Sequence, residues 1–159
     1  MRIFFALLAL CSLSSHVVWG QNLLEERIRK LSSRKKSVYL NRGVFHNGGP
    51  KSPSVLKAVR HSYSSSRGYE RIVFDFETQA MPRLYGYIAG DQNKVYVDFF
   101  EVSPKKALSS FGESKFVKSL NFFPLTEETL SVEIIFKKNV SIDIFYLDSP
   151  ARLVIDVKA

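Results

Sequence analysis

Residues 94–99 read KVYVDF, in which the apolar Val95, Val97 and Phe99 alternate with Lys94, Tyr96 and Asp98. This two-residue period is typical of a β-strand that is buried on one face and exposed on the other. The run recurs at residues 152–157, RLVIDV, which also begin with a basic residue and carry an aspartate at the fifth position. We predict that one face of each strand lies in the core, and these faces comprise Val95, Val97 and Phe99, and Leu153, Ile155 and Val157.

The similarity extends outward from these two strands. Residues 84–99 align with residues 142–157 without a gap, and Phe-x-Phe at 74–76 matches Ile-x-Phe at 134–136. Such internal similarity predicts two related β units that pair into one domain.

Other segments carry the same strand pattern. They occupy residues 71–77, 116–123 (ended by Pro124), 130–136 and 140–147. Seven or eight short strands separated by turn signals predict an all-β fold, a small β-sandwich built from an internal repeat.

Residues 1–20 have the organisation of a signal peptide. Arg2 precedes a nearly uninterrupted apolar run over residues 3–13, shorter than the roughly 20 residues of a membrane-spanning helix. We predict cleavage after Gly20, with an uncleaved or lipidated anchor as the alternative. Cys11, the only cysteine, lies in the removed segment, so the mature chain can form no disulfide. Because the exported mature chain contains no cysteine, we predict that the protein is located in the periplasm, in the cell envelope of a Gram-negative-type bacterium.

Residues 21–68 are predicted to form a basic, partly helical and mostly flexible tether, followed by the β domain at 69–159. Residues 21–70 carry 11 lysines or arginines against 3 acids, a net charge of about +8, whereas residues 71–159 carry 11 against 12, a net charge of about −1. Apolar residues at helical spacing over residues 22–34 predict a short amphipathic helix, and residues 37–68, rich in Gly, Pro and Ser, predict a flexible linker. The positive charge of the tether indicates one of two roles: the tether is attracted to anionic envelope material, or it is a solvated spacer. No motif of a nucleic-acid-binding fold accompanies it.

Four motifs follow one another in the predicted domain. They are RIVFDF at 71–76, KVYVDF at 94–99, FVKSL at 116–120 ahead of the strand at 130–136, and RLVIDV at 152–157. In this order they resemble the AMIN domain, which precedes the catalytic domain of periplasmic N-acetylmuramoyl-L-alanine amidases and also occurs in secretins. The resemblance implies a sandwich of two small sheets that holds a protein at peptidoglycan or a related envelope polymer.

The predicted domain lacks the residues that several kinds of catalysis need. The histidines, His16, His46 and His61, all precede residue 69, so neither a zinc centre nor a serine triad is expected in the domain. Asp98 and Asp156 are repeat-equivalent carboxylates, for which we expect pairing with arginine or backbone donors rather than glycosidase chemistry. We therefore predict a protein that is not an enzyme and that binds no metal and no cofactor.

The candidate binding residues lie on the face opposite the predicted core. Tyr85, Tyr87 and Tyr96 belong to this face, with Arg83 and Lys94 close in sequence. Tyrosine rings can stack on sugars, and arginine or lysine can bind the carboxylates of peptides. The alternative is that these tyrosines are ordinary cross-strand residues, which β-sheets favour whatever their function.

These features predict a non-catalytic periplasmic module that binds peptidoglycan or another anionic cell-envelope polymer, with membrane contact only through the tether and with no nucleic-acid partner. The alternative is an accessory subunit that docks through a sheet edge or an apolar patch onto a secretin, a pilus or another envelope assembly. The neighbours Phe99 and Phe100, and Phe122 and Phe123, favour this alternative, because both members of such a pair cannot face inward on a regular strand.

Overall fold

The computed structural model describes residues 28–33, 37–105 and 111–159, so the predicted signal peptide and the first part of the predicted tether lie outside it. Within these ranges the regular elements are β-strands and one 3₁₀ turn, η1 (Gly90–Gln92). The strands are β1 (Ile28–Lys30), β2 (Gly43–Asn47), β3 (Ser54–Ser64), β4 (Tyr69–Phe76), β5 (Leu84–Ala89), β6 (Lys94–Phe100), β7 (Val102–Pro104), β8 (Val117–Thr126), β9 (Thr129–Phe136), β10 (Ser141–Leu147) and β11 (Arg152–Lys158). The described residues contain no helix of the length and apolar character that a membrane crossing requires. The prediction of an all-β fold is confirmed.

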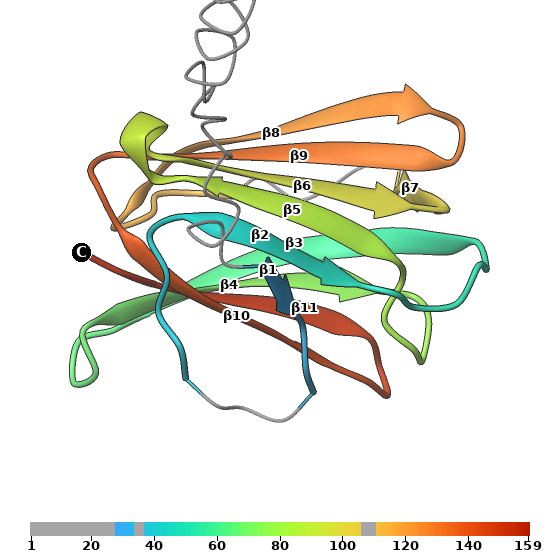
Figure 1. Ribbon diagram of the computed structural model, residues 1–159, viewed down its shortest axis with the longest axis horizontal. Helices are drawn as coiled ribbons and strands as arrows, with labels where there is room; N and C mark the ends of the chain where they lie inside the picture. The colour runs from blue at the N-terminus through green and yellow to red at the C-terminus, as the bar shows by residue number, and fades with distance from the viewer. Residues whose placement is uncertain (1–27, 34–36, 106–110) are drawn as a thin grey trace, which may run out of the picture.

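The strands form two mixed sheets that lie face to face (Figure 1). One sheet has the order β1-β2-β5-β6-β9-β8, and the other has the order β10-β11-β4-β3-β7. Neighbouring strands are antiparallel except for two parallel pairs, β1 with β2 and β3 with β7. Buried apolar side chains from both layers form one hydrophobic cluster. We refer to the layers as the six-stranded and the five-stranded sheet.

The two segments related by the sequence repeat occupy matching places in the two sheets. β5 and β6 are neighbours in the six-stranded sheet, and the equivalent β10 and β11 are neighbours in the five-stranded sheet. The strand that precedes each pair joins the other sheet, because β9 pairs with β6 and β4 pairs with β11. The registers also correspond, since Val97 lies opposite Val132 and Ile155 lies opposite Ile72. Each unit therefore supplies one strand to the sheet of the other unit.

The side chains predicted to face the core are buried. No more than 1% of the surface of any of them is exposed: Val95, Val97, Phe99, Leu153, Ile155 and Val157. Phe99 contacts Phe74 and Phe76 of the opposite sheet, with ring centroids 5.7 and 5.2 Å apart. Gly86 lets the ring of Phe45 lie against β5, because a Cβ atom at position 86 would come within 2.1 Å of Phe45 Cζ.

The prediction of a flexible linker is wrong for the described part of residues 37–68. This part contains β2 and β3, and β3 pairs with β4 from Leu56 to Ser64. Leu56 and Val59 are buried in the core. The strand escaped prediction because a register shift between Leu56 and Ala58 interrupts its alternation and because its second half is largely polar. Pairing with β4, which a sequence pattern does not reveal, orders the segment.

The prediction of an N-terminal helix is also wrong where it can be compared. Ile28–Lys30 forms β1, which runs parallel to β2, and Leu31 is buried. Among the described residues of this apolar pattern, Leu31 is buried by tertiary packing. Isolated short helices are marginal in water, so sheet pairing easily overrides a helical pattern of this length.

The edge strands are short, interrupted or covered. β1 and β7 have three residues each. β8 runs through Pro124, past its predicted end at residue 123, since an edge strand tolerates a proline that donates no hydrogen bond. Register shifts interrupt the ladder of β8 near both ends. Beside β10, Leu40 and Ile142 exchange two backbone hydrogen bonds of 2.8 Å. Such features limit the addition of a strand from another molecule.

Substitution of either repeat-equivalent core residue should unfold the protein. Val97→Asp and Ile155→Asp each place a charge at a position that is 0% exposed. Burying an unpaired charge costs several kcal/mol, comparable with a typical net stability of about 5–15 kcal/mol. Circular dichroism and thermal unfolding measure the effect, with Lys118→Asp at an exposed position of β8 as the control. A Val97→Asp or Ile155→Asp protein that melts like the parent would contradict the assigned inward face.

Deletion of residues 21–68 should also prevent folding. It removes β1, β2 and β3, and with them the buried side chains of Phe45, Leu56 and Val59. The matched comparison is a chain that begins at residue 21, which keeps these strands. The expected result is a cooperative thermal transition for the longer chain and none for the shorter one. An equally cooperative transition in the shorter chain would restore the predicted domain boundary at residue 69.

Candidate functional site

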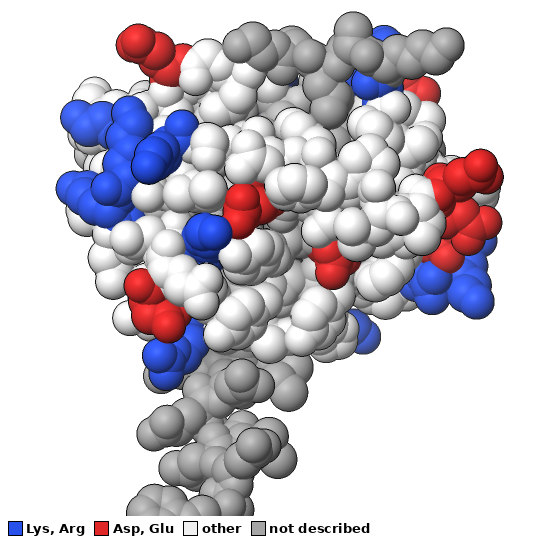
Figure 2. Space-filling model, turned by 90° about the horizontal axis from the view of Figure 1, so that it is seen from above, with Lys and Arg blue, Asp and Glu red and all other residues white. Residues whose placement is uncertain are grey.

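Three tyrosines lie together on the outer face of the six-stranded sheet. Tyr87 of β5 lies directly opposite Tyr96 of β6, and Tyr85 lies two residues earlier on the same face of β5. Tyr85 is 46% exposed, and the other two side chains are half-buried. Figure 2 shows that charged side chains are sparse over the middle of this face. We call Tyr85, Tyr87 and Tyr96 the tyrosine face.

Strand β2 borders this surface with two residues that sequence reasoning did not place there, the buried Val44 and the half-buried His46. Val44 lies opposite Tyr87, and His46 lies opposite Tyr85. Both residues fall within the predicted tether, which the sequence places outside the β domain. The signal that could have found them is the apolar pair Val44 and Phe45 within GVFHN at residues 43–47, since both side chains are buried.

Lys94 lies beside the tyrosine face, but a carboxylate already binds it. Its Nζ is 2.8 Å from Glu133 Oε1 and 5.9 Å from the centroid of the Tyr96 ring. Asn121 donates to the other oxygen of Glu133 at 3.0 Å. The hydrogen bond with Glu133 raises the pKa of Lys94, and the same bond, followed by that from Asn121, lowers the pKa of Glu133. This chain of polar groups borders Tyr96 on the side of β9 and β8.

Arg83 lies at the start of β5, at the far end of the surface from Lys94. Its Nε and Nη2 donate to the two carboxylate oxygens of Glu101 at 3.2 and 2.5 Å, and its guanidinium lies over the Phe100 ring at 5.6 Å. A shallow pocket of about 200 Å³ lies here, lined by His46, Asn47, Arg83, Leu84 and Phe100. The structure therefore places Arg83 and Lys94 at opposite ends of the tyrosine face, and each is paired with an acid.

The arrangement offers a surface that could bind a ligand. Three aromatic rings share a surface whose borders carry amide, carboxylate and cationic groups. Aromatic side chains offer large, rigid contact areas with apolar faces, and the polar groups around them can hydrogen-bond hydroxyl or amide groups of a ligand.

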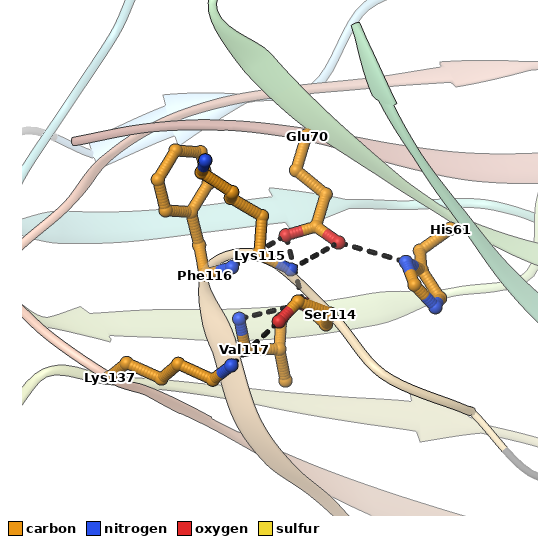
Figure 3. A network of polar contacts seen from close by, with 7 residues as sticks. All are labelled: His61, Glu70, Ser114, Lys115, Phe116, Val117 and Lys137. Carbon is orange, nitrogen blue, oxygen red and sulfur yellow. Dashed lines mark hydrogen bonds and ion pairs between the residues drawn. The ribbon is translucent and has the colours of Figure 1, made fainter. Parts of the chain in front are cut away.

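A second polar site centres on the buried carboxylate of Glu70 in β4 (Figure 3). Glu70 is 0% exposed and bonds with His61 Nδ1 at 2.8 Å. It accepts further hydrogen bonds from the Ser114 hydroxyl at 2.8 Å and from the backbone N–H groups of Lys115 and Phe116 at 3.2 and 2.8 Å. The carboxylate thereby fastens the segment before β8 to β4.

The order of groups around Glu70 differs from that of a serine triad. In such a triad the imidazole lies between the hydroxyl and the carboxylate and takes the proton of the hydroxyl. Here Glu70 lies between His61 and Ser114, and the Ser114 hydroxyl donates to Glu70 and accepts from the backbone N–H of Val117 at 2.8 Å. The hydroxyl therefore serves as a bridge between β4 and the start of β8.

A third polar cluster lies on the outer face of the five-stranded sheet. Arg71 donates to both oxygens of the fully buried Asp156 at 2.6 and 2.8 Å, so the predicted pairing of this aspartate with an arginine is confirmed. The guanidinium of Arg71 also lies over the rings of Tyr69 and Phe145, at 5.3 and 5.6 Å. Burial raises the pKa of the nearby Tyr39 to about 12, and the charge of Asp156 adds to the rise.

The two histidines of the described region are part of the fold. His46 belongs to β2 and His61 to β3, so the expectation that both precede the folded domain is wrong. Over residues 28–33, 37–105 and 111–159, no three His, Cys, Asp or Glu side chains are grouped so as to hold a metal ion.

No protein-family model matches this chain, and no curated protein matches it. The resemblance to the AMIN domain therefore stays a prediction from the sequence motifs.

Removal of the Glu70 carboxylate should destabilise the protein strongly. Glu70→Ala leaves the Ser114 hydroxyl and the Phe116 N–H buried without their acceptor, and each such loss costs about 1–3 kcal/mol. We expect the free energy of unfolding in urea to fall by about 3 kcal/mol. Glu113→Ala, at an exposed position of the same segment, should change it by less than about 0.5 kcal/mol. Equal effects of the two substitutions would refute the anchoring role of Glu70.

Proposed function

We propose that this protein is a non-catalytic module of the periplasm that binds peptidoglycan or another cell-envelope polymer through the tyrosine face. The observation that carries the proposal is the grouping of Tyr85, Tyr87 and Tyr96 on the outer face of one sheet, where they have no part in the core. The AMIN-like motifs and the signal-peptide pattern of residues 1–20 support the same assignment from the sequence.

The chemistry of the tyrosine face fits a saccharide chain. Sugar rings have apolar faces that stack on aromatic side chains, and hydroxyl and amide groups at their edges that form hydrogen bonds. Tyr87 and Tyr96 lie side by side across β5 and β6, and Tyr85 lies next to Tyr87 along β5, so the three residues form a corner. Successive rings of a polymer would meet successive tyrosines. Asn121 and Glu133 on one side and His46 on the other would bind the sugar edges.

Docking onto a secretin, a pilus or another envelope assembly is the second candidate. It is favoured by Phe123 and Leu125 of β8, which are 47% and 62% exposed. Pro124 between them donates no backbone hydrogen bond, so side chains rather than strand addition would carry such a contact. The two candidates use different residues and can be separated by substitution.

Replacement of Tyr85, Tyr87 and Tyr96 by alanine should weaken binding to isolated sacculi by about ten- to hundredfold, since an aromatic contact contributes about 0.5–1.5 kcal/mol beyond the area it buries. Co-sedimentation at low and high salt measures the effect, which should be similar at both because stacking is a short-range interaction. Phe123→Ala with Leu125→Ala is the control and should bind sacculi as the parent does. A folded triple variant with unchanged binding would refute the tyrosine face as the site. Loss of binding to an envelope protein in the Phe123 and Leu125 variant alone would favour the docking candidate.

A further inference from the structure

One end of the sandwich gathers basic side chains from four separate segments. They come from the β3–β4 turn, the start of β8 with the residues before it, the β9–β10 loop and the end of β11: Arg67, Lys115, Lys118, Lys137, Lys138 and Lys158. Figure 1 shows the β3–β4 turn, the β9–β10 loop and the C-terminus at the left of the molecule, and blue side chains cluster at the left of Figure 2. We call these six residues the basic end.

Within the part of the chain that the structure describes, none of these six cations forms an ion pair with an acidic side chain. Five cations in other parts of the described chain form ion pairs with acids, among them Arg60 with Asp75 at 2.5 Å and Arg83 with Glu101 at 2.5 Å. The cations of the basic end instead contact rings and a carbonyl group. Lys115 lies over Tyr63 at 4.9 Å, and Lys137 donates to the carbonyl oxygen of Ser114 at 2.7 Å. The only acid in the segment before β8 is the exposed Glu113.

The basic end is also held in place. Glu70 accepts the backbone N–H groups of Lys115 and Phe116, which fixes the segment that carries the first lysines of the cluster (Figure 3). Lys138 lies over the Phe116 ring at 5.6 Å, so two lysines rest on aromatic side chains of the same end. Like charges gathered without neutralising partners repel one another, and an anionic surface relieves that repulsion. A fold that holds them together in this way is suited to an anionic partner.

We propose that the basic end docks on the surface of a membrane that contains anionic phospholipids. Loops from both sheets converge at this end, so they can meet a flat surface at the same time. Lysine is a point charge on a flexible stem, which suits mobile lipid phosphates better than the fixed fork of arginine. Tyr63, 43% exposed beside Lys115, is the kind of ring that lies at the level of lipid headgroups. The basic end and the tyrosine face are different sides of the sandwich, so both can be occupied together.

The test is co-sedimentation of the mature chain with vesicles of phosphatidylcholine, with and without phosphatidylglycerol. The variant carries Lys115→Gln, Lys118→Gln and Lys138→Gln. The matched control removes three exposed lysines outside the basic end, Lys51→Gln, Lys57→Gln and Lys105→Gln, and so has the same net charge. Unchanged thermal unfolding of both variants verifies that they are folded, and the single variant Lys118→Gln provides a milder change.

We expect binding to vesicles with phosphatidylglycerol and not to phosphatidylcholine alone. The triple variant should bind on the order of a hundredfold more weakly, because each lysine near an anionic surface contributes about fivefold. The control should bind like the parent, and Lys118→Gln should have a small effect in the same direction. The alanine variant of the tyrosine face should keep its vesicle binding, which separates this proposal from the proposed function.

Several outcomes would overturn the proposal. Equal losses in the triple variant and its control would show that only net charge matters. Equal binding to both kinds of vesicle would remove the role of lipid charge. Binding to soluble polyphosphate without binding to vesicles would assign the basic end to a phosphate-bearing polymer instead of a membrane.

Discussion

Two antiparallel pairings hold this sandwich together, β9 with β6 and β4 with β11. In each of them a strand of one repeat unit completes the sheet of the other unit, so neither unit contains a finished sheet of its own. The hydrophobic core between the sheets exists only when both pairings are made. Such pairings join residues far apart in the sequence, and their loop-closure entropy must be offset before they stabilise the fold. The rest of the structure depends on this exchange of strands, in which β4 and β9 each pair in the sheet of the other repeat unit.

Each sheet has one outer face, and the two outer faces differ in how far their residues are buried. Asp98 and Asp156 hold equivalent places in the repeat, yet Asp98 is half-buried opposite Tyr85, whereas Asp156 is fully buried with Arg71. The difference follows from the residues around them, since Arg71, Tyr69 and Phe145 pack around Asp156 on the five-stranded sheet. On the outer face of the six-stranded sheet Tyr85 is exposed and Tyr87 and Tyr96 are half-buried, and this is the surface we assign to binding.

Polar groups inside and around the sandwich serve mainly to position these surfaces. Glu70 fastens the residues before β8 and thereby fixes part of the basic end. Glu133 holds Lys94 beside Tyr96 and is itself held by Asn121. Because the sheet edges are short, interrupted or covered, the exposed faces and ends are better suited to intermolecular contacts than the backbone of an edge strand. This organisation holds the tyrosine face and the basic end, the two surfaces that we propose for contact with other molecules, on separate sides of the fold.

The sequence by itself determined the all-β class, the repeat and the inward face of β6 and β11. A strand with one buried face has apolar residues at every second position, and this alternation is visible in the sequence. The sequence also placed Tyr85, Tyr87 and Tyr96 on one outer face by the same period. Only the tertiary structure decided that β2 and β3 belong to the sheets, since a polar strand with a register shift looks like a linker until its partner is known. It alone brought His46 beside Tyr85, placed Arg83 and Lys94 at opposite ends of the tyrosine face, and joined six distant cations at one end. These features depend on which strands become neighbours, and that choice is made by packing the whole core rather than by any local pattern.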